Sequence, residues 1–170
     1  MVTNVRTGQA EYLPVRDMLS DIRLVQASAS LPLVSNMVPI GGQKYLDGGI
    51  ADPIPLRRAL ADGFSKAVVV LTRAADYQKQ PDRAMALLRL KYARYPQLLQ
   101  AMRARHLQYN QTLALIAAKE AAGRAFVIRP DAPPAVGRVE RDPAKLTALH
   151  DAGFAAAEKA DARLREFVGA

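Results

Sequence analysis

The sequence has 170 residues, of which 50% are apolar, so it can bury a core as one domain or as a domain with a small appendage. Cysteine is absent, which excludes disulfides, a thiolate nucleophile and cysteine-ligated zinc sites. The two histidines stand far apart in the chain, so we expect no metal site, and no run of 18 apolar residues predicts a membrane-spanning helix.

The formal net charge is +8, and the basic excess is concentrated in the middle of the chain. Residues 81–145 hold twelve lysine and arginine residues against five acidic residues. A basic helical face suits anionic lipid headgroups, and each such residue near the surface contributes about 1 kcal/mol. The alternative is an ordinary solvated helix face. No recognised motif for nucleic acid accompanies the scattered basic residues, so we expect no nucleic-acid partner.

The N-terminal residues carry neither the basic start nor the apolar run of a secretory signal. Together with the absence of cysteine, this predicts a cytoplasmic protein. The basic middle region adds membrane association as an alternative, through contact with an anionic lipid surface.

The first third of the chain predicts two short strands and a helix. Residues 2–5 and 10–13 flank a connection with a turn glycine, which is typical of paired strands. Apolar residues then recur at every third or fourth position and predict a helix over residues 15–32 that ends by the proline. Ser28 and Ser30 at its end lack a surrounding nucleophile elbow, so we interpret both as structural.

A hairpin leads to the most informative motif of the chain. Residues 38–40 and 43–46 flank two glycines at a typical two-residue turn, and Asp47 follows the second strand directly. Gly48 and Gly49 come next. Glycine permits positive φ and the close approach of another backbone, so both residues can shape a tight turn after Asp47. This motif is suited to presenting the Asp47 carboxylate. The alternative is a plain turn in which Asp47 bonds its own backbone.

The segment after the motif predicts a short helix and a buried strand. Asp52 precedes a proline, so we interpret its carboxylate as the N-cap of a helix ending near Gly63 rather than as a catalytic group. Residues 67–72 form a continuous apolar, β-branched run, typical of a parallel strand buried on both faces. The first 80 residues hardly supply partners for such a strand, which favours further strands upstream.

The remainder of the chain is predicted to be mostly helical. Helices are expected over residues 82–94, from residue 96 to about 123, and from residue 143 nearly to the terminus, with a short strand at 125–128. His106 lies in the apolar seam of the second helix, where a lone histidine is usually a hydrogen-bonded packing residue.

The order of these motifs resembles the second half of the catalytic domain of patatin-like phospholipases over roughly the first 80 residues. The segments that carry this resemblance are Thr3–Gly8, Gln26–Pro32, Asp47–Gly49 and Ala67–Arg73. The remainder is similar to the helical C-terminal extension of one bacterial subgroup of that family, through Arg105–His106, Tyr109–Asn110, Phe126–Pro130 and Arg141–Pro143. The resemblance implies an α/β fold, with part of a patatin-like three-layer α/β/α domain over residues 1–80 and a helical extension over 81–170.

The same resemblance implies an activity, the hydrolysis of lipid acyl esters through an acyl-serine intermediate. Asp47 would be the base of a Ser-Asp dyad, Gly48 and Gly49 would shape its turn, and neither a cofactor nor a metal would be needed. The family's Gly-x-Ser-x-Gly nucleophile and its glycine-rich oxyanion loop are absent from this sequence. A missing N-terminal half carrying the nucleophilic serine is therefore the expected partner, beside the lipid or ester substrate.

Two alternatives stay open at this point. The chain could be a non-enzymatic module whose basic helices bind anionic membranes, or an inactive remnant of a truncated gene. Binding that falls steeply with salt, whether or not Asp47 is present, would favour the membrane module. The sequence leaves open which lipid or ester is cleaved, the role of the helical extension and the oligomeric state.

Overall fold

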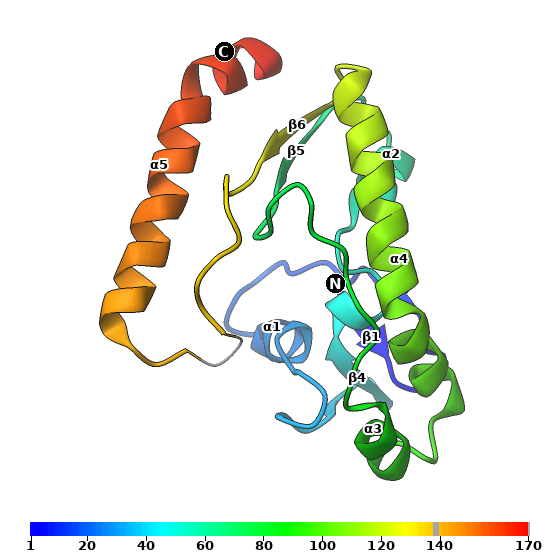
Figure 1. Ribbon diagram of the computed structural model, residues 1–170. Coiled ribbons are helices and arrows are strands. Elements are labelled where there is room, and N and C mark those ends of the chain that lie inside the picture. Colours follow the sequence, from blue (N-terminus) through cyan, green and yellow to red (C-terminus); the bar gives the residue numbers. More distant parts are fainter. Residues whose placement is uncertain (138–139, 170) are drawn as a thin grey trace. The chain divides into compact units, whose positions relative to one another are not determined.

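A computed structural model describes residues 1–137 and 140–169 of the chain (Figure 1). The fold is α/β, with helices, one antiparallel sheet and one short parallel sheet. The chain forms two compact units, which we call unit 1 and unit 2. Unit 1 comprises Met1–Pro55 and Lys79–Thr112, and unit 2 comprises Leu56–Gln78 and Leu113–Ala170. Both units draw residues from each side of position 80, whereas the sequence-based division places a single boundary there.

Unit 1 contains the antiparallel sheet, in the order β2-β1-β4-β3. Its outer hairpin turns at Gly41 and Gly42, whose φ angles of 55° and 76° are those of a two-residue turn that glycine adopts without strain. The predicted strands and hairpin are therefore confirmed, although the first two strands are shorter than expected. The strands are β1 (Val2–Asn4), β2 (Ala10–Glu11), β3 (Val38–Ile40) and β4 (Gln43–Asp47).

The first helix, α1 (Ile22–Ser28), begins seven residues later than the apolar pattern predicts, but it ends before the proline as expected. Local polar contacts explain the late start. The carboxylate of Asp21 accepts a hydrogen bond from the Arg16 N–H at 2.8 Å, and that of Asp17 accepts one from the Ser20 N–H at 2.8 Å. Aspartate side chains that bind nearby backbone groups favour turns over helix, and here they outweigh the apolar periodicity.

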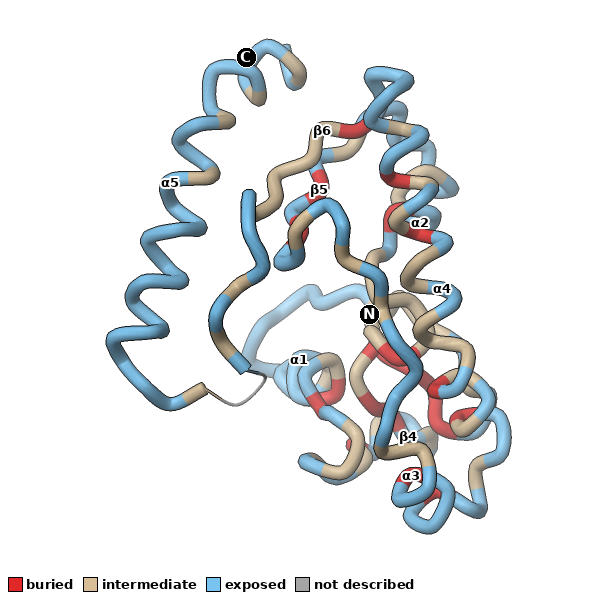
Figure 2. The backbone as a smooth tube through the Cα atoms, in the orientation of Figure 1, coloured by how far each residue is buried: buried red, intermediate tan, exposed pale blue. Residues whose placement is uncertain are grey.

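A hydrophobic core holds the sheet of unit 1 to two later helices, α3 (Met85–Lys91) and α4 (Pro96–Ala121). Leu46 and Leu98 are completely buried, and the hydroxyl of buried Tyr92 accepts a hydrogen bond from the Leu33 N–H at 3.2 Å. Figure 2 shows buried residues of unit 1 around β4 and along the first part of α4. The core cluster consists of Val5, Leu46, Ile50, Leu88, Tyr92, Leu98 and Met102.

Unit 2 is built on a two-stranded parallel sheet of β5 (Ala67–Val70) and β6 (Ala125–Ile128), preceded by α2 (Leu56–Ala61). The predictions of a parallel strand near residue 67 and of a strand at 125–128 are confirmed. The expectation that β5 is buried on both faces is wrong, because Val69 is 7% exposed whereas Val70 is 69% exposed. Only one face of this sheet is packed, so the side chains of β5 that point to the other face stay in solvent.

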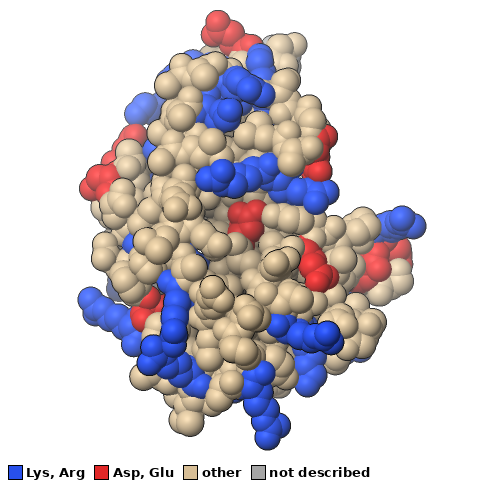
Figure 3. All heavy atoms as spheres, turned by 90° about the vertical axis from the view of Figure 1, so that its right-hand side faces the viewer, with Lys and Arg blue, Asp and Glu red and all other residues tan. Residues whose placement is uncertain are grey.

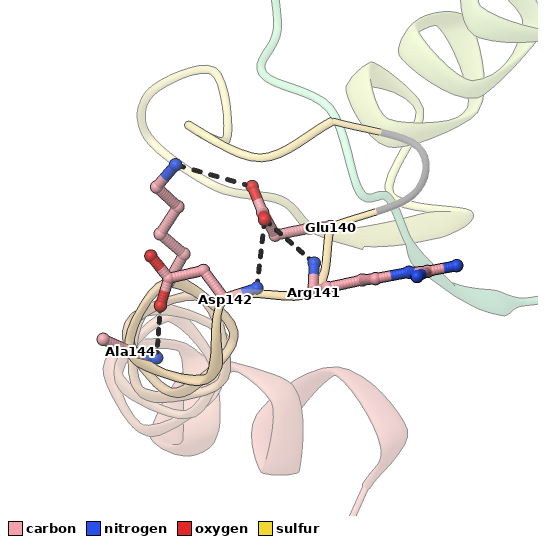
Figure 4. A network of polar contacts seen from close by, with 5 residues as sticks. Glu140, Arg141, Asp142 and Ala144 are labelled. Atoms are coloured by element: carbon pink, nitrogen blue, oxygen red, sulfur yellow. Dashed lines mark hydrogen bonds and ion pairs between the residues drawn. The ribbon is translucent and has the colours of Figure 1, made fainter.

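The last helix, α5 (Pro143–Val168), begins at the predicted cap. The Asp142 carboxylate accepts a hydrogen bond from the Ala144 N–H at 2.9 Å, and Pro143 occupies the first turn. Just before it, the Glu140 carboxylate accepts hydrogen bonds from the Arg141 N–H at 2.9 Å and the Asp142 N–H at 3.1 Å (Figure 4). These bonds satisfy donors at a helix start that would otherwise face only water.

None of the described helices is long and apolar enough to cross a membrane.

Candidate active site

Asp47 is the last residue of β4 and the N-cap of a single 3₁₀ turn, η1 (Gly48–Ile50). Its backbone N–H donates to the Ser30 carbonyl oxygen at 2.9 Å. Its side-chain Oδ1 accepts a hydrogen bond from the Gly49 N–H at 2.7 Å. The main chain and one carboxylate oxygen are therefore both held, so the side chain has a defined direction.

The second carboxylate oxygen of Asp47 differs from the first in its contacts. Within the described part of the chain, Oδ2 accepts no hydrogen bond. No buried side-chain oxygen or nitrogen there lacks a partner, so Oδ2 must be in contact with solvent. A carboxylate with one anchored and one open oxygen can accept a proton from a hydroxyl group brought beside it.

A buried threonine supports this turn from the neighbouring strand. Thr3 lies in β1 opposite Leu46, and its side chain is fully buried. The Thr3 hydroxyl donates to the Asp47 carbonyl oxygen at 2.8 Å and lies 3.3 Å from the Ala51 N–H, which donates to it. One side chain thus bonds both ends of η1, which fixes the turn that carries the carboxylate.

The two glycines of the motif are required for reasons that differ in part from the prediction. Neither Gly48 nor Gly49 has a positive φ, so the expected left-handed conformation is wrong for both. A Cβ on Gly48 would lie 2.7 Å from the Met1 carbonyl oxygen, so this position admits only glycine, as the predicted close backbone approach implies. A Cβ on Gly49 would lie 3.1 Å from Asp47 Oδ1 and would crowd the carboxylate.

Arg105 of α4 reaches the same turn, which sequence reasoning did not foresee. Its Nε donates to the Gly49 carbonyl oxygen at 2.7 Å. Its Nη2 lies 3.8 Å from the position that a Gly49 Cβ would occupy, a point 3.1 Å from Asp47 Oδ1. The guanidinium therefore bonds the turn that carries the carboxylate, although within the described residues the two groups form no ion pair. Helical spacing is the signal in the sequence that places Arg105 on the buried face of α4. Arg105 follows buried Leu98 by seven residues and buried Met102 by three.

The predicted role of Asp52 as a helix cap is wrong. Helix α2 begins four residues later, at Leu56, and the Asp52 carboxylate instead accepts a hydrogen bond from the Tyr12 hydroxyl. The Asp52 N–H donates to the Gly48 carbonyl oxygen at 3.0 Å, so this residue still belongs to the end of the η1 turn. The turn and the tyrosine hold Asp52 away from the position that a cap would need.

Side chains of β1, β2 and β4 form a polar network within the sheet that carries Asp47. The Tyr45 hydroxyl donates to Glu11 Oε2 at 2.8 Å, and the Asn4 amide donates to Glu11 Oε1 at 2.8 Å. Burial, and then the neighbouring Glu11 carboxylate, raise the pKa of the Tyr45 hydroxyl above its ordinary value. Tyr45 therefore stays a neutral donor that holds β4 in place.

The other residues considered from the sequence make local contacts. The hydroxyl of buried Ser30 donates to the Gln26 carbonyl oxygen at 2.7 Å, in keeping with a structural role. His106 Nδ1 lies 2.9 Å from the Arg103 carbonyl oxygen within its own helix. Among residues 1–137 and 140–169, no serine hydroxyl bonds the Asp47 carboxylate, and no three acidic or histidine side chains are grouped to hold a metal ion.

The C-terminal part of the chain is similar to a known protein family. Residues 95–169 match a family described as a domain of unknown function (DUF6363). This segment contains α4, β6 and α5, so it includes Arg105 and leaves Asp47 outside. No curated protein matches the chain.

Proposed function

We propose that this chain contributes Asp47 as the general base of a patatin-like acyl hydrolase, which cleaves lipid acyl esters through an acyl-serine intermediate. The observation that carries this proposal is the state of the Asp47 carboxylate, with Oδ1 held by the Gly49 N–H at 2.7 Å and Oδ2 open. A serine hydroxyl is a weak nucleophile at neutral pH and needs an adjacent base to take its proton as it attacks a carbonyl carbon.

In the proposed reaction, the nucleophilic serine and the oxyanion hole come from a polypeptide segment outside these 170 residues. Asp47 takes the serine proton as the acyl-serine forms and returns it to the leaving alcohol, then activates water for the second half-reaction. Arg105 supports this role by donating from Nε to the Gly49 carbonyl oxygen at 2.7 Å, which helps to hold the turn that carries the base.

The proposed setting is an anionic membrane surface in the cytoplasm, with lipid or ester as substrate and a three-layer domain completed by the missing strands. The net charge of +8 supports the approach to such a surface, because anionic lipids attract basic residues.

Ester hydrolysis tests this proposal. A short-chain chromogenic ester and a phospholipid are offered to this chain alone and to a longer protein that contains the chain together with a Gly-x-Ser-x-Gly segment. We expect activity only in the longer protein, and a loss of about 10²- to 10⁴-fold in its Asp47→Asn variant. Asparagine keeps an oxygen that can accept from the Gly49 N–H, so the turn survives while the base is lost.

Asp52→Asn is the matched control, because it removes a second carboxylate of the same turn. We expect it to keep activity within a few-fold of the parent protein. Full activity in Asp47→Asn would reduce Asp47 to a turn residue. No activity in any form would favour the non-catalytic membrane module or the inactive remnant.

A further inference from the structure

A second feature of unit 1 is a basic hollow away from the Asp47 turn. It has a volume of about 420 Å³, and three cationic side chains line it. Arg6 comes from the connection after β1, Lys44 from β4 and Arg94 from the connection between α3 and α4. Gln43, Tyr95 and Pro96 complete much of the wall, and none of the acidic residues that the structure describes lines it.

The three cations have no counter-ion in the part of the chain that the structure describes. Within residues 1–137 and 140–169, the side chains of Arg6, Lys44 and Arg94 form no hydrogen bond, ion pair or ring contact. Three like charges that share one hollow repel one another, and no acidic side chain among the described residues is paired with them. An anion of more than one charge is therefore the ligand that this arrangement suits.

The backbone fixes the three segments relative to one another. The Asn4 side-chain oxygen accepts from the Arg6 N–H at 2.9 Å, and the Val5 N–H donates to the Lys44 carbonyl oxygen at 2.9 Å. At Gly8, a Cβ would lie 2.4 Å from the Gln97 carbonyl oxygen, so the connection after β1 is packed directly against the first turn of α4. The hollow is therefore formed before any ligand arrives.

The chemistry of the walls favours phosphate over carboxylate. Two guanidinium groups and an ammonium group supply more donors than one carboxylate can accept, whereas a phosphate ester offers three oxygens and up to two negative charges. Pro96 begins a helix of 26 residues at the edge of the hollow, and the positive end of a helix dipole adds to the attraction. The volume is in the range of small-ligand sites.

We propose that this hollow binds the phosphate group of an organic phosphate. Its source is either a phospholipid headgroup or a free phosphate ester, since both present the same group. The site does not involve Asp47, so it is independent of the proposed hydrolase activity.

The test uses the whole chain and two probes. Glycerol 3-phosphate, with glycerol as its neutral counterpart, is titrated by calorimetry, and vesicles of phosphatidylcholine with or without phosphatidic acid are used in co-sedimentation. We expect the chain to bind at least one phosphate probe and neither neutral counterpart. Binding of glycerol 3-phosphate alone identifies a free phosphate ester. Binding of phosphatidic acid vesicles that glycerol 3-phosphate displaces identifies a lipid headgroup.

The variant Arg6→Gln/Lys44→Gln/Arg94→Gln removes the charge of the hollow, and we expect it to weaken binding at least ten-fold. Arg16→Gln/Arg23→Gln/Arg103→Gln removes three exposed charges elsewhere in unit 1 and should leave binding within two-fold. Lys44→Gln against Arg103→Gln repeats the comparison with single, exposed substitutions, should the triple variant fail to fold. Equal losses in both sets, or no binding of either phosphate probe by the parent chain, would overturn the proposal.

Discussion

The two units differ in their internal packing. In unit 1, side chains far apart in the sequence meet in one core, and completely buried residues such as Val5, Leu46 and Leu98 pack together. In unit 2, α5 has no buried residue, and Phe154 is 60% exposed. The contacts of α5 lie at the surface, including a Phe126–Phe167 ring pair with centroids 5.6 Å apart. Fixed positions for functional side chains therefore exist mainly in unit 1, and both proposed sites lie there.

The units also differ in whether their surface cations form ion pairs. In unit 2, several cations have acidic partners, among them Arg129 with Glu120 at 2.7 Å and Lys159 with Asp131 at 3.1 Å. In unit 1, the cations around the basic hollow have none within the described residues. Lysine and arginine side chains are also spread widely over the face shown in Figure 3. Exposed ion pairs stabilise little, so the difference bears on ligand binding rather than on stability.

The contrast in packing is tested most directly by two leucine truncations. Leu46→Ala removes a fully buried side chain from the core of unit 1, and we expect a loss of about 2–5 kcal/mol in the free energy of unfolding. Leu149→Ala, at a position of α5 that is 39% exposed, should lose less than about 1 kcal/mol. Chemical denaturation followed by circular dichroism measures both. Equal losses would mean that the two units are packed alike.

Alanine substitutions at two glycines distinguish the cost of backbone strain from the cost of close packing. Gly8 and Gly123 have similar positive φ angles, 68° and 65°, so an alanine at either position is strained by about 1–2 kcal/mol. At Gly8 the new Cβ would collide with a backbone, whereas at Gly123 no atom of the described residues lies within 4 Å of it. We expect Gly8→Ala to destabilise more than Gly123→Ala in thermal unfolding. The same loss at both positions would contradict the close packing of the connection after β1 on α4.

The N-cap of α5 provides a smaller effect that should stay within unit 2. Asp142→Ala removes the bond to the Ala144 N–H, and we expect the first turn of α5 to lose about 1 kcal/mol in its free energy of local opening. Amide hydrogen exchange measures this loss. Glu158→Ala, in the middle of the same helix, is the control and should leave exchange of the first turn unchanged. Faster exchange in β4 as well would show that the cap also stabilises unit 1.

The smallest expected effect is a pH dependence at the start of α5. Hydrogen bonds from the Asp142 N–H and then the Arg141 N–H lower the pKa of Glu140 below its ordinary value of 4.5. The unfolded chain therefore binds a proton at higher pH than the folded chain, so the stabilisation is complete above pH 4.5 and is lost as the pH falls through the lower folded pKa. Amide chemical shifts of Arg141 and Asp142 should follow this titration. Glu140→Gln should abolish it, and a titration midpoint at or above 4.5 would contradict the prediction.

Local signals in the sequence predicted much of this fold. The glycine pair at 41–42, the proline that begins α4 and the Asp142-Pro143 start of α5 act through their immediate neighbours, so pattern alone was sufficient. The start of α1 and the role of Asp52 were wrong because side-chain hydrogen bonds redirected the backbone. In each of those cases a polar contact outweighed an apolar or capping pattern.

The candidate site was predicted in part for the same reason. The Asp47 turn was visible because its residues are adjacent in the sequence. The buried hydroxyl of Thr3 and the guanidinium of Arg105 reach the turn from positions 44 and 56 residues away from the residues they bond. The pairing of strands and the rotation of α4 decide those contacts, and no local pattern encodes either.

The separation of these partners has a consequence for how the protein is made. The Asp47 turn needs Thr3 from one end of the chain and Arg105 from well beyond its middle, so its assembly has a high contact order. Closing such long loops costs conformational entropy before any contact stabilises the turn. During synthesis the bond from Arg105 cannot form until residue 105 has left the ribosome, so a nascent chain carries the Asp47 turn without this support until then.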